Sequence, residues 1–293
     1  NSIYIYKLYS RVGNSMSNFS DFIGGGGSAS FPTIFLSKSQ TWVPPQDGNI
    51  CIHVIGGGGG GAGWSEYTTS GGAGGYCKKN TLAVTTSGSF TVVVGAGGAG
   101  GANNRGNTGG GGTGGNSTVA GTGLSSTLTA NGGAGGVYSS SAIPAGGTAA
   151  NGDVNNTGGA GGAVSGTDGG AGGGAVGLTG TGQAGSVGNK DLPIAGECDI
   201  IGDFWSSTMG QIAGGIAGRC VRHTTSTVPY DGVNGGPLSG GGGIIFNTGS
   251  ERLVQGGAGG IGGGGGAAEN KGHISSSLGG EGGEGIVVIQ YIP

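Results

Sequence analysis

The residues best equipped for chemistry are Cys220 and His223, which stand in a Cys-x-x-His spacing, and the upstream thiol Cys198. Thiolate sulfur and imidazole nitrogen are the usual ligands of structural zinc. The separation of Cys198 from Cys220 matches no strong zinc signature, so incidental thiols are the simpler interpretation. We therefore expect no metal and no cofactor, and these three residues are the candidate ligands if a metal is bound.

The remaining cysteines, Cys51 and Cys77, lie far from the other two in the sequence. Four cysteines are too sparse to crosslink a chain of 293 residues, so we expect mostly free thiols in a protein made in a reducing cytoplasm. Cys51 and His53 alternate on one face of a strand-like segment. Such a pair is more often packed than metal-binding.

The sequence offers little for hydrolytic catalysis. It contains no G-x-S-x-G nucleophile motif, and its histidines lack neighbours that suggest a triad: His53, His223 and His273. Asp199 and Asp203 could be the acid and base of a glycosidase, but no other nearby residue points to one. Glu281 and Glu284 share one GGEGGE unit and are best explained as a solvated face. We expect no enzymatic activity.

Residues 95–100 read GAGGAG and match the dinucleotide-binding pattern G-x-G-x-x-G after an apolar segment. With 83 glycines among 293 residues, several such matches are expected by chance. Residues 101–115 cannot open the helix that the pattern requires, and no Asp or Glu between Glu66 and Asp153 could bind a ribose. We expect no nucleotide site.

The glycine content excludes an ordinary helical or α/β enzyme fold, because each interior Gly costs about 0.5–1 kcal/mol relative to Ala. Charged residues are 9% of the chain and hydrophobic residues 33%, which favours a folded chain over a disordered one. The net charge of -3 provides no basic surface for nucleic acid or anionic lipid. No apolar run is long enough to insert across a membrane.

A unit of the form Gly-Gly-x-Gly-Gly-x recurs along the chain, without the strict triplet register that collagen needs. A period of three matches the polyglycine II helix, whose backbone groups must pair with neighbouring segments. We therefore predict a packed bundle of polyglycine II helices, and flexible linkers are the alternative. The copies begin at Gly71, Gly97, Gly132, Gly158, Gly169, Gly256 and Gly279.

Three β-branched segments bounded by glycine are predicted to be strands that pair in a small sheet: residues 50–55, 90–94 and 286–292. Both faces of the first are apolar enough to be partly covered. Shorter candidates are residues 3–9, 34–36, 126–129 and 243–246. The predicted fold class is mainly β and irregular, a small β-sheet region combined with a packed bundle of polyglycine II helices and essentially no α-helix.

Glycine becomes sparse from about residue 187 to residue 233, where aromatic, acidic and cysteine residues gather. Residues 64–70 and 137–144 are smaller excursions of the same kind. Long, chemically diverse loops on a rigid scaffold are where binding function is usually placed.

Both ends of the glycine-rich region resemble a known family. Residues 39–63 (SQTWVPPQDGNICIHVIGGGGGGAG), 71–84 (GGAGGYCKKNTLAV), 88–101 (GSFTVVVGAGGAGG) and 279–293 (GGEGGEGIVVIQYIP) closely resemble the glycine-rich domain of bacteriophage tail and tail-fibre proteins. The resemblance covers residues 40–293 and is compositional in the middle. It implies an N-terminal attachment or oligomerisation segment, residues 1–39, and a glycine-rich domain, residues 40–293, with a long excursion at about 187–233.

The resemblance implies a non-catalytic virion protein at the tip of a tail fibre, made in the host cytoplasm and acting outside the cell. Its partners would be a bacterial outer-surface protein or glycan, recognised during host attachment, and other tail-fibre subunits in what is commonly a homotrimer. By analogy with the polyglycine adhesins of T-even-like phages, the long excursion would be the tip. Candidate receptor-binding residues are the aromatic and imidazole side chains of the excursions: Trp64, Tyr67, Tyr138, Phe204, Trp205, His223 and Tyr230.

Each of these side chains could instead pack against the glycine-rich scaffold. Two other functions also stay open. A polyglycine bundle with small third residues could bind ice, although such a protein should lack a long aromatic excursion. The chain could equally be a purely structural fibre or coat component, in which the excursion mediates contact between subunits.

Overall fold

The computed structural model describes residues 32–64, 67–102, 109–138, 142–162, 173–174, 176–177, 180–185, 221–223, 232–246, 253–270 and 277–293. All of them belong to one compact unit, Pro32–Pro293. The described residues contain strands and irregular segments and no α-helix, so the predicted fold class, mainly β and irregular, is confirmed. None of them forms a helix that could cross a membrane.

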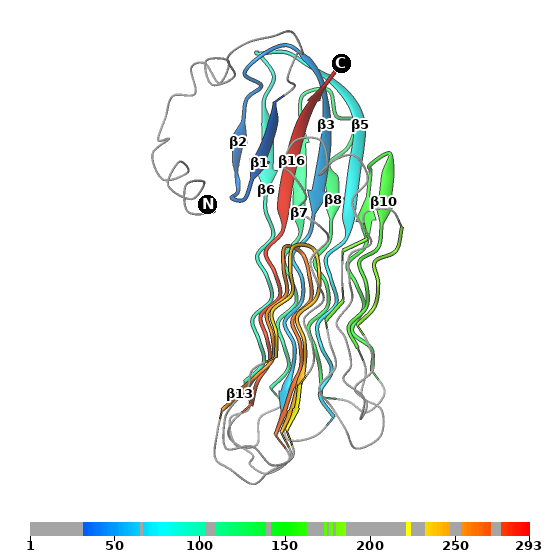
Figure 1. The fold of residues 1–293 in the computed structure, drawn as a ribbon. Helices are drawn as coiled ribbons and strands as arrows, with labels where there is room; N and C mark the ends of the chain where they lie inside the picture. The colour runs from blue at the N-terminus through cyan, green and yellow to red at the C-terminus, as the bar shows by residue number, and fades with distance from the viewer. Residues whose placement is uncertain are drawn as a thin grey trace, which may run out of the picture. The chain divides into compact units, whose positions relative to one another are not determined.

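Five antiparallel strands form the first sheet, in the order β1-β16-β3-β5-β10 (Figure 1). Its long central strands are rich in Ile and Val, which favour a pleated, buried surface. Strand β3 pairs with β16 on one side and with β5 on the other over most of its length, although β16 is far from both in the sequence. The strands are β1 (Thr33–Leu36), β16 (Ile286–Ile292), β3 (Gly48–Ile55), β5 (Tyr76–Val84) and β10 (Val154–Asn156).

A second antiparallel sheet has the order β2-β6-β7-β8-β9. In β6, Phe90 and Val92 are buried while Thr91 and Val93 are exposed, as expected for a strand with one face on a core. The strands are β2 (Gln40–Trp42), β6 (Phe90–Val93), β7 (Ser117–Gly121), β8 (Leu128–Ala130) and β9 (Ala149–Ala150).

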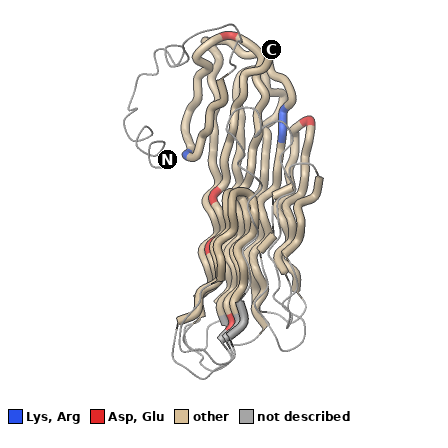
Figure 2. Tube along the Cα trace, in the orientation of Figure 1, with Lys and Arg blue, Asp and Glu red and all other residues tan. Residues whose placement is uncertain are grey.

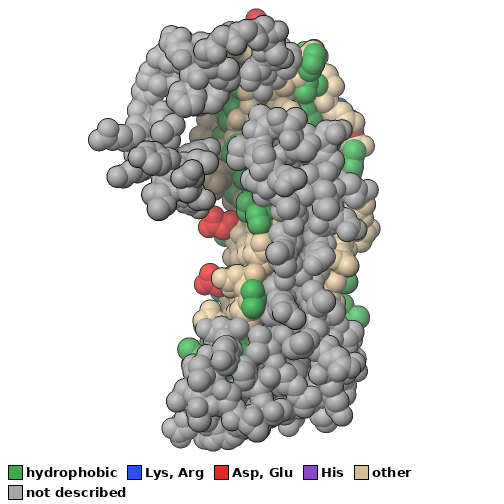
Figure 3. All heavy atoms as spheres, viewed as in Figure 1, with side chains coloured by type: hydrophobic (Ala, Val, Ile, Leu, Met, Phe, Trp, Pro, Cys, Tyr) green, Lys and Arg blue, Asp and Glu red, His purple; other side chains and the backbone are tan. Residues whose placement is uncertain are grey.

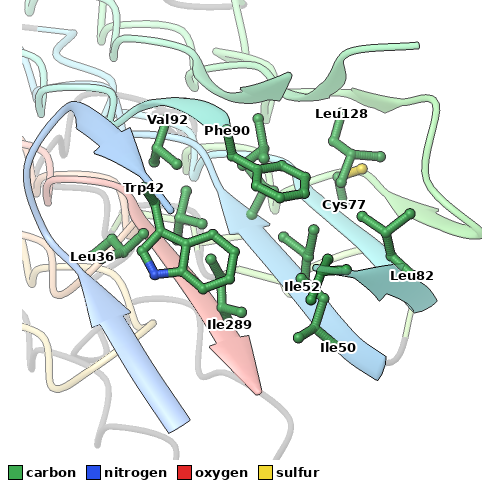
Figure 4. Close-up of a cluster of buried hydrophobic side chains, with 14 of the residues drawn as sticks. Leu36, Trp42, Ile50, Ile52, Cys77, Leu82, Phe90, Val92, Leu128 and Ile289 are labelled. Atoms are coloured by element: carbon green, nitrogen blue, oxygen red, sulfur yellow. The ribbon is translucent and has the colours of Figure 1, made fainter. Parts of the chain in front are cut away.

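The two sheets pack face to face, and their inward side chains form the main hydrophobic core (Figure 4). Trp42 and Phe90 of the second sheet lie with their ring centroids 5.4 Å apart. They face Ile50, Ile52 and Ile289 of the first sheet, all fully buried. This β-sandwich supplies the apolar burial that the glycine-rich part of the chain cannot provide.

Glycine segments continue directly from the strands of the sandwich and run side by side (Figure 1). Along residues 56–63 the backbone N–H groups donate in turn to residues 69–75, 109–115 and 279–283, and then the sequence of partners repeats. The donors to residues 69–75, for example, are Gly56, Gly59 and Ala62. The hydrogen bonds therefore have a period of three, which is the period that a polyglycine II helix requires. The polyglycine II conformation itself stays a prediction.

Residues 56–62 are surrounded by other segments on every side. Besides donating to three neighbours, their carbonyl groups accept hydrogen bonds from three more segments: residues 95–101, 132–136 and 262–268. Residues 69–75 and 262–268 likewise bond to six neighbouring segments each. These three are the interior segments of the bundle, and lateral pairing satisfies backbone groups that would otherwise be buried without partners.

At the end of the glycine segments away from the sandwich, the described chain forms short parallel strands. One sheet has the order β11-β12-β14-β4, and a separate pair joins β13 to β15. The strands are β4 (Gly63–Trp64), β11 (Val221–His223), β12 (Ile244–Phe246), β13 (Val254–Gln255), β14 (Ala268–Asn270) and β15 (Ser277–Leu278). We call this part the distal end.

The strand predictions for residues 50–55, 90–94 and 286–292 are confirmed by β3, β6 and β16. The prediction that all three share one sheet is wrong, because β6 belongs to the second sheet. The reason is that the apolar side of β6 packs across the core onto β3 and β16, so the strands are partners in packing and not in hydrogen bonding. Both faces of β3 are buried, as predicted. The candidate strand at residues 3–9 lies outside the described residues.

Candidate binding surface

Residues from segments far apart in the sequence meet at the distal end. Gly63 forms a bridge with Gly109, and Ala102 forms one with Leu278. Strand β14 pairs with β4 and with β12, so the residues that precede segments 65–66, 247–252 and 271–276 also lie together. The described ends of several glycine segments are therefore gathered at one end.

The first and last described residues lie at the opposite end of the unit. The backbone N–H of Tyr291 donates to the carbonyl oxygen of Pro32 at 3.0 Å. Strand β16 enters the sandwich from a glycine segment at Ile286 and finishes at Ile292, on the side away from the distal end (Figure 1). The described chain thus begins and ends beside the sandwich.

The aromatic rings of Tyr67 and Tyr138 contact each other near the distal end. Their ring centroids are 6.3 Å apart in an edge-to-face arrangement, at an interplanar angle of 61°. Tyr138 keeps 43% of its surface exposed. Tyr67 has φ of 54°, in the left-handed region that an aromatic residue rarely adopts. Backbone strain of this kind clusters at functional sites, because the surrounding structure must hold it in place.

The segments behind the two tyrosines fix their position. Thr68 pairs with Tyr138 in an antiparallel bridge. The backbone N–H of Thr69 donates to the carbonyl oxygen of Val137 at 3.1 Å, and the N–H of Val137 donates to the Thr69 hydroxyl oxygen at 2.8 Å. Thr68 and Thr69 are fully buried. The aromatic pair is therefore carried on a rigid part of the backbone.

Two large aliphatic side chains near Tyr138 in the sequence are exposed. Residues 131–134 pair with residues 145–148 in antiparallel sense, through Ala134 and Ala145 among others. Val137 is 39% exposed and Ile143 60% exposed. The sequence analysis did not select these two residues, although two large apolar residues beside glycine runs were a usable signal.

The structure describes only some of the other candidate residues. Trp64 lies in β4, where its backbone pairs with Glu269, and His223 ends β11, where it pairs with Phe246; only the backbone of the two candidates is described. Three further binding candidates lie outside the described residues: Phe204, Trp205 and Tyr230. The metal-ligand candidates Cys198 and Cys220 lie outside them too. Of the seven candidate binding residues, the structure brings Tyr67 and Tyr138 into contact.

An acidic flank runs along a different side of the glycine segments. Glu281 and Glu284 are exposed, as the sequence predicted, and Figure 3 shows acidic side chains at the surface of the glycine-rich part. Their segment bonds to residues 95–101, in which Ala96 and Ala99 are also exposed. The described lysines lie on the sandwich (Figure 2). In these two edge segments the Ala and Glu side chains, one at every third position, thus face solvent, while the glycines face neighbouring segments.

Cys51, His53 and Tyr76 form a buried chain of polar groups on the outer face of the first sheet. Cys51 Sγ lies 3.2 Å from His53 Nε2, and His53 Nδ1 lies 2.7 Å from the Tyr76 hydroxyl oxygen. Burial, helped by the Lys78 ammonium, lowers the pKa of His53 to about 3, and burial raises the pKa of the Cys51 thiol. A neutral imidazole and a neutral thiol cannot act as an activated nucleophile pair, so packing explains them.

Within the described ranges, no cluster of three or more His, Cys, Asp or Glu side chains could hold a metal ion. Residues 95–100, which match the dinucleotide pattern, lie among the glycine segments and are followed by no helix in the described part of the chain.

Sequence comparison gives one family. The sequence model of a glycine-rich domain matches residues 33–292, nearly the whole chain. The match includes β1, which the sequence analysis placed within segment 1–39. No curated protein matches the chain in sequence.

Proposed function

The chain belongs to the glycine-rich domain family, and we propose that it is the non-catalytic receptor-recognition module of a phage tail fibre or tail tip. The observation that carries the proposal is the polarity of the unit. Strands β1 and β16 lie in the sandwich, whereas Thr68 and Tyr138, from two of the glycine-poor stretches, pair near the other end of the glycine segments. A module attached at one end and diversified at the other suits the presentation of binding loops to a surface.

The glycine segments support the same role mechanically. Each interior segment is hydrogen-bonded to six neighbours, so the scaffold between the sandwich and the distal end holds its backbone in a single arrangement. Loops carried on a preorganised scaffold lose less conformational entropy on binding, which leaves more of the contact energy for affinity.

The sandwich end joins the module to other tail-fibre subunits, residues 1–39 contribute to attachment, and three copies form the working assembly. The protein is made in the host cytoplasm, is carried on the virion and acts outside the cell. Its target is a protein or glycan on the bacterial outer surface, and it needs no cofactor.

The test is adsorption of the labelled full chain to a panel of bacterial strains. A variant in which a short Gly/Ser bridge replaces residues 187–219 removes most of the long excursion, including Phe204 and Trp205, and keeps β11. We expect the intact chain to bind at least one strain, and the variant, if it melts at the same temperature, to lose that binding. If the intact chain binds no strain but assembles into fibres, the structural-component alternative replaces the proposal. A folded variant that binds equally well moves the contact away from this excursion.

A further inference from the structure

We propose that copies of this chain associate through one corner of the glycine bundle, formed by residues 109–115 and the flanking segments 95–101 and 131–137. The inference rests on the proposed function, which places three copies in the working assembly, and it names the surface that joins them. It follows from the arrangement of the glycine segments, from the backbone groups that the corner leaves open and from its side chains.

The six segments bonded to residues 56–62 form a closed ring around them. In order around the ring, they are residues 95–101, 109–115, 131–137, 69–75, 262–268 and 279–285. Each of the six is hydrogen-bonded to the next, so the segments form a hexagonal array. Within the described part of the chain, residues 109–115 bond only to the interior segment and to their two neighbours in the ring. They are therefore a corner of the array.

The angle of the corner suits three copies. In a hexagonal array, the row that joins residues 95–101 to residues 109–115 meets the row that joins residues 109–115 to residues 131–137 at one third of a full turn. Three such corners close around a threefold axis parallel to the glycine segments. Closed cyclic symmetry is the usual form of a homo-oligomer, so this corner fits a trimer of the chain.

The corner leaves backbone groups available for further pairing. Within the described residues, the N–H of Thr113 and the carbonyl groups of Gly111 and Gly114 bond to no other segment. The same holds for the N–H groups of Gly97 and Gly100 in the flanking segment. An edge of this kind resembles the edge strand of a β-sheet, which pairs readily with another chain. A partner must repeat every three residues to bond along it, and the glycine segments of a second copy do so.

The side chains of the corner let another copy approach closely. Residues 90–102 and 109–138 contain no Asp, Glu, Lys or Arg, and Arg105, between them, lies outside the described residues. The exposed side chains of the corner are small: Ala96, Ala99 and Thr113. Identical surfaces without charge can meet without electrostatic repulsion.

The adjoining edge of the bundle does not have this property. Residues 279–285 carry the exposed Glu281 and Glu284. Copies that met there would bring like charges together, which costs association energy. The charge pattern therefore selects the corner at residues 109–115 over the acidic flank.

The second sheet of the sandwich extends the corner. Strand β6 runs into residues 95–101, and residues 109–115 run into β7 (Figure 1). The side chains of this sheet that face away from the core include three threonines in adjacent strands: Thr91, Thr118 and Thr129. Faces with β-branched side chains pack well sheet against sheet, so the contact can continue along the sandwich.

Sedimentation equilibrium of the full chain measures the assembly. We expect a mass three times the 27.5 kDa of one chain. Thr113→Asp places three carboxylates around the axis and should weaken association by at least about tenfold, with an unchanged far-UV circular dichroism spectrum. Thr81→Asp is the matched control, because Thr81 is exposed on β5 of the first sheet. It should associate within about twofold of the parent.

Crosslinking tests the position of the corner without adding charge. In a Cys198→Ser, Cys220→Ser background, a short bismaleimide should join Thr113→Cys chains in pairs and should leave Thr81→Cys chains single. A trimer in which Thr113→Cys yields no crosslinked pair would overturn the inference. So would a folded Thr113→Asp variant that associates as strongly as the parent.

Adsorption to bacterial cells separates this inference from the proposed function. A chain that stays monomeric but adsorbs to a strain overturns the corner as an interface and leaves receptor recognition standing. A chain that forms the trimer through the corner but adsorbs to no strain supports the interface and counts against receptor recognition.

Discussion

His53 Nδ1 and the Tyr76 hydroxyl oxygen lie 2.7 Å apart on the outer face of the first sheet, where both residues are almost fully buried. The two residues come from β3 and β5, whose register places His53 beside Lys78 and Tyr76 beside Ile55. The hydrogen bond can form with a neutral imidazole or with an imidazolium that donates to the hydroxyl oxygen. Burial favours the neutral form, because it penalises the charged ring. The pair therefore links the stability of the sandwich to pH.

Acidification should destabilise the chain through His53. Its pKa is lowered to about 3 in the folded state, whereas an unfolded His titrates near 6.5, so the unfolded chain binds the proton first. The stabilisation is complete above about pH 6.5 and is lost as pH falls toward 3, at about 1.4 kcal/mol per pH unit. Urea unfolding at pH 7.5 and pH 5.0 measures the difference. His53→Gln should lose less stability between these pH values, and an equal loss in both proteins would contradict the assignment.

Glycines of the interior segments should not tolerate a methyl group. A Cβ on Gly59 would lie 2.1 Å from the carbonyl oxygen of Ala134, whereas a Cβ on Gly110 would lie 3.4 Å from its nearest neighbour, the carbonyl oxygen of Gly136. We expect Gly59→Ala to destabilise the fold by about 3 kcal/mol or more and Gly110→Ala to change stability by less than about 0.5 kcal/mol. Thermal melting compares the two, and similar melting temperatures would rule out the close packing described.

The core of the sandwich should depend strongly on Phe90. Its side chain is 1% exposed and packs against Trp42. Phe90→Ala should cost about 3–5 kcal/mol through lost burial and the cavity left behind. Val93→Ala in the same strand removes an exposed side chain and should stay within about 0.5 kcal/mol. Chemical denaturation of both variants provides the measurement, and a cost below about 1 kcal/mol for Phe90→Ala would refute a tightly packed core.

The thiols of Cys51 and Cys77 should be unreactive in the folded chain. Both are buried and free, and burial raises the pKa of Cys77 to about 11 and raises that of Cys51. The reactive thiolate is therefore scarce at pH 8. In a Cys198→Ser, Cys220→Ser variant, a thiol reagent such as DTNB should react only after guanidinium unfolding. Rapid reaction of the folded variant with DTNB would contradict the burial of these two thiols.

Part of this organisation was predictable from local sequence. The β-branched segments at residues 50–55 and 286–292 became paired strands because alternating apolar side chains fit a pleated sheet with covered faces. The exposure of Glu281 and Glu284 followed from their spacing. The pairing of Tyr67 with Tyr138 was not predictable, because nothing in either neighbourhood identifies the other.

The sequence by itself determined which segments are glycine segments and which are the long apolar strands. It did not determine which glycine segments lie inside, because residues 71–75 belong to an interior segment and residues 97–101 to an edge although both read GGAGG. Tertiary structure alone decided which segments are neighbours and that β6 joins the second sheet. The physical reason is that backbone hydrogen bonds between glycine segments are chemically identical, so the choice of partner depends on the packing of the whole unit.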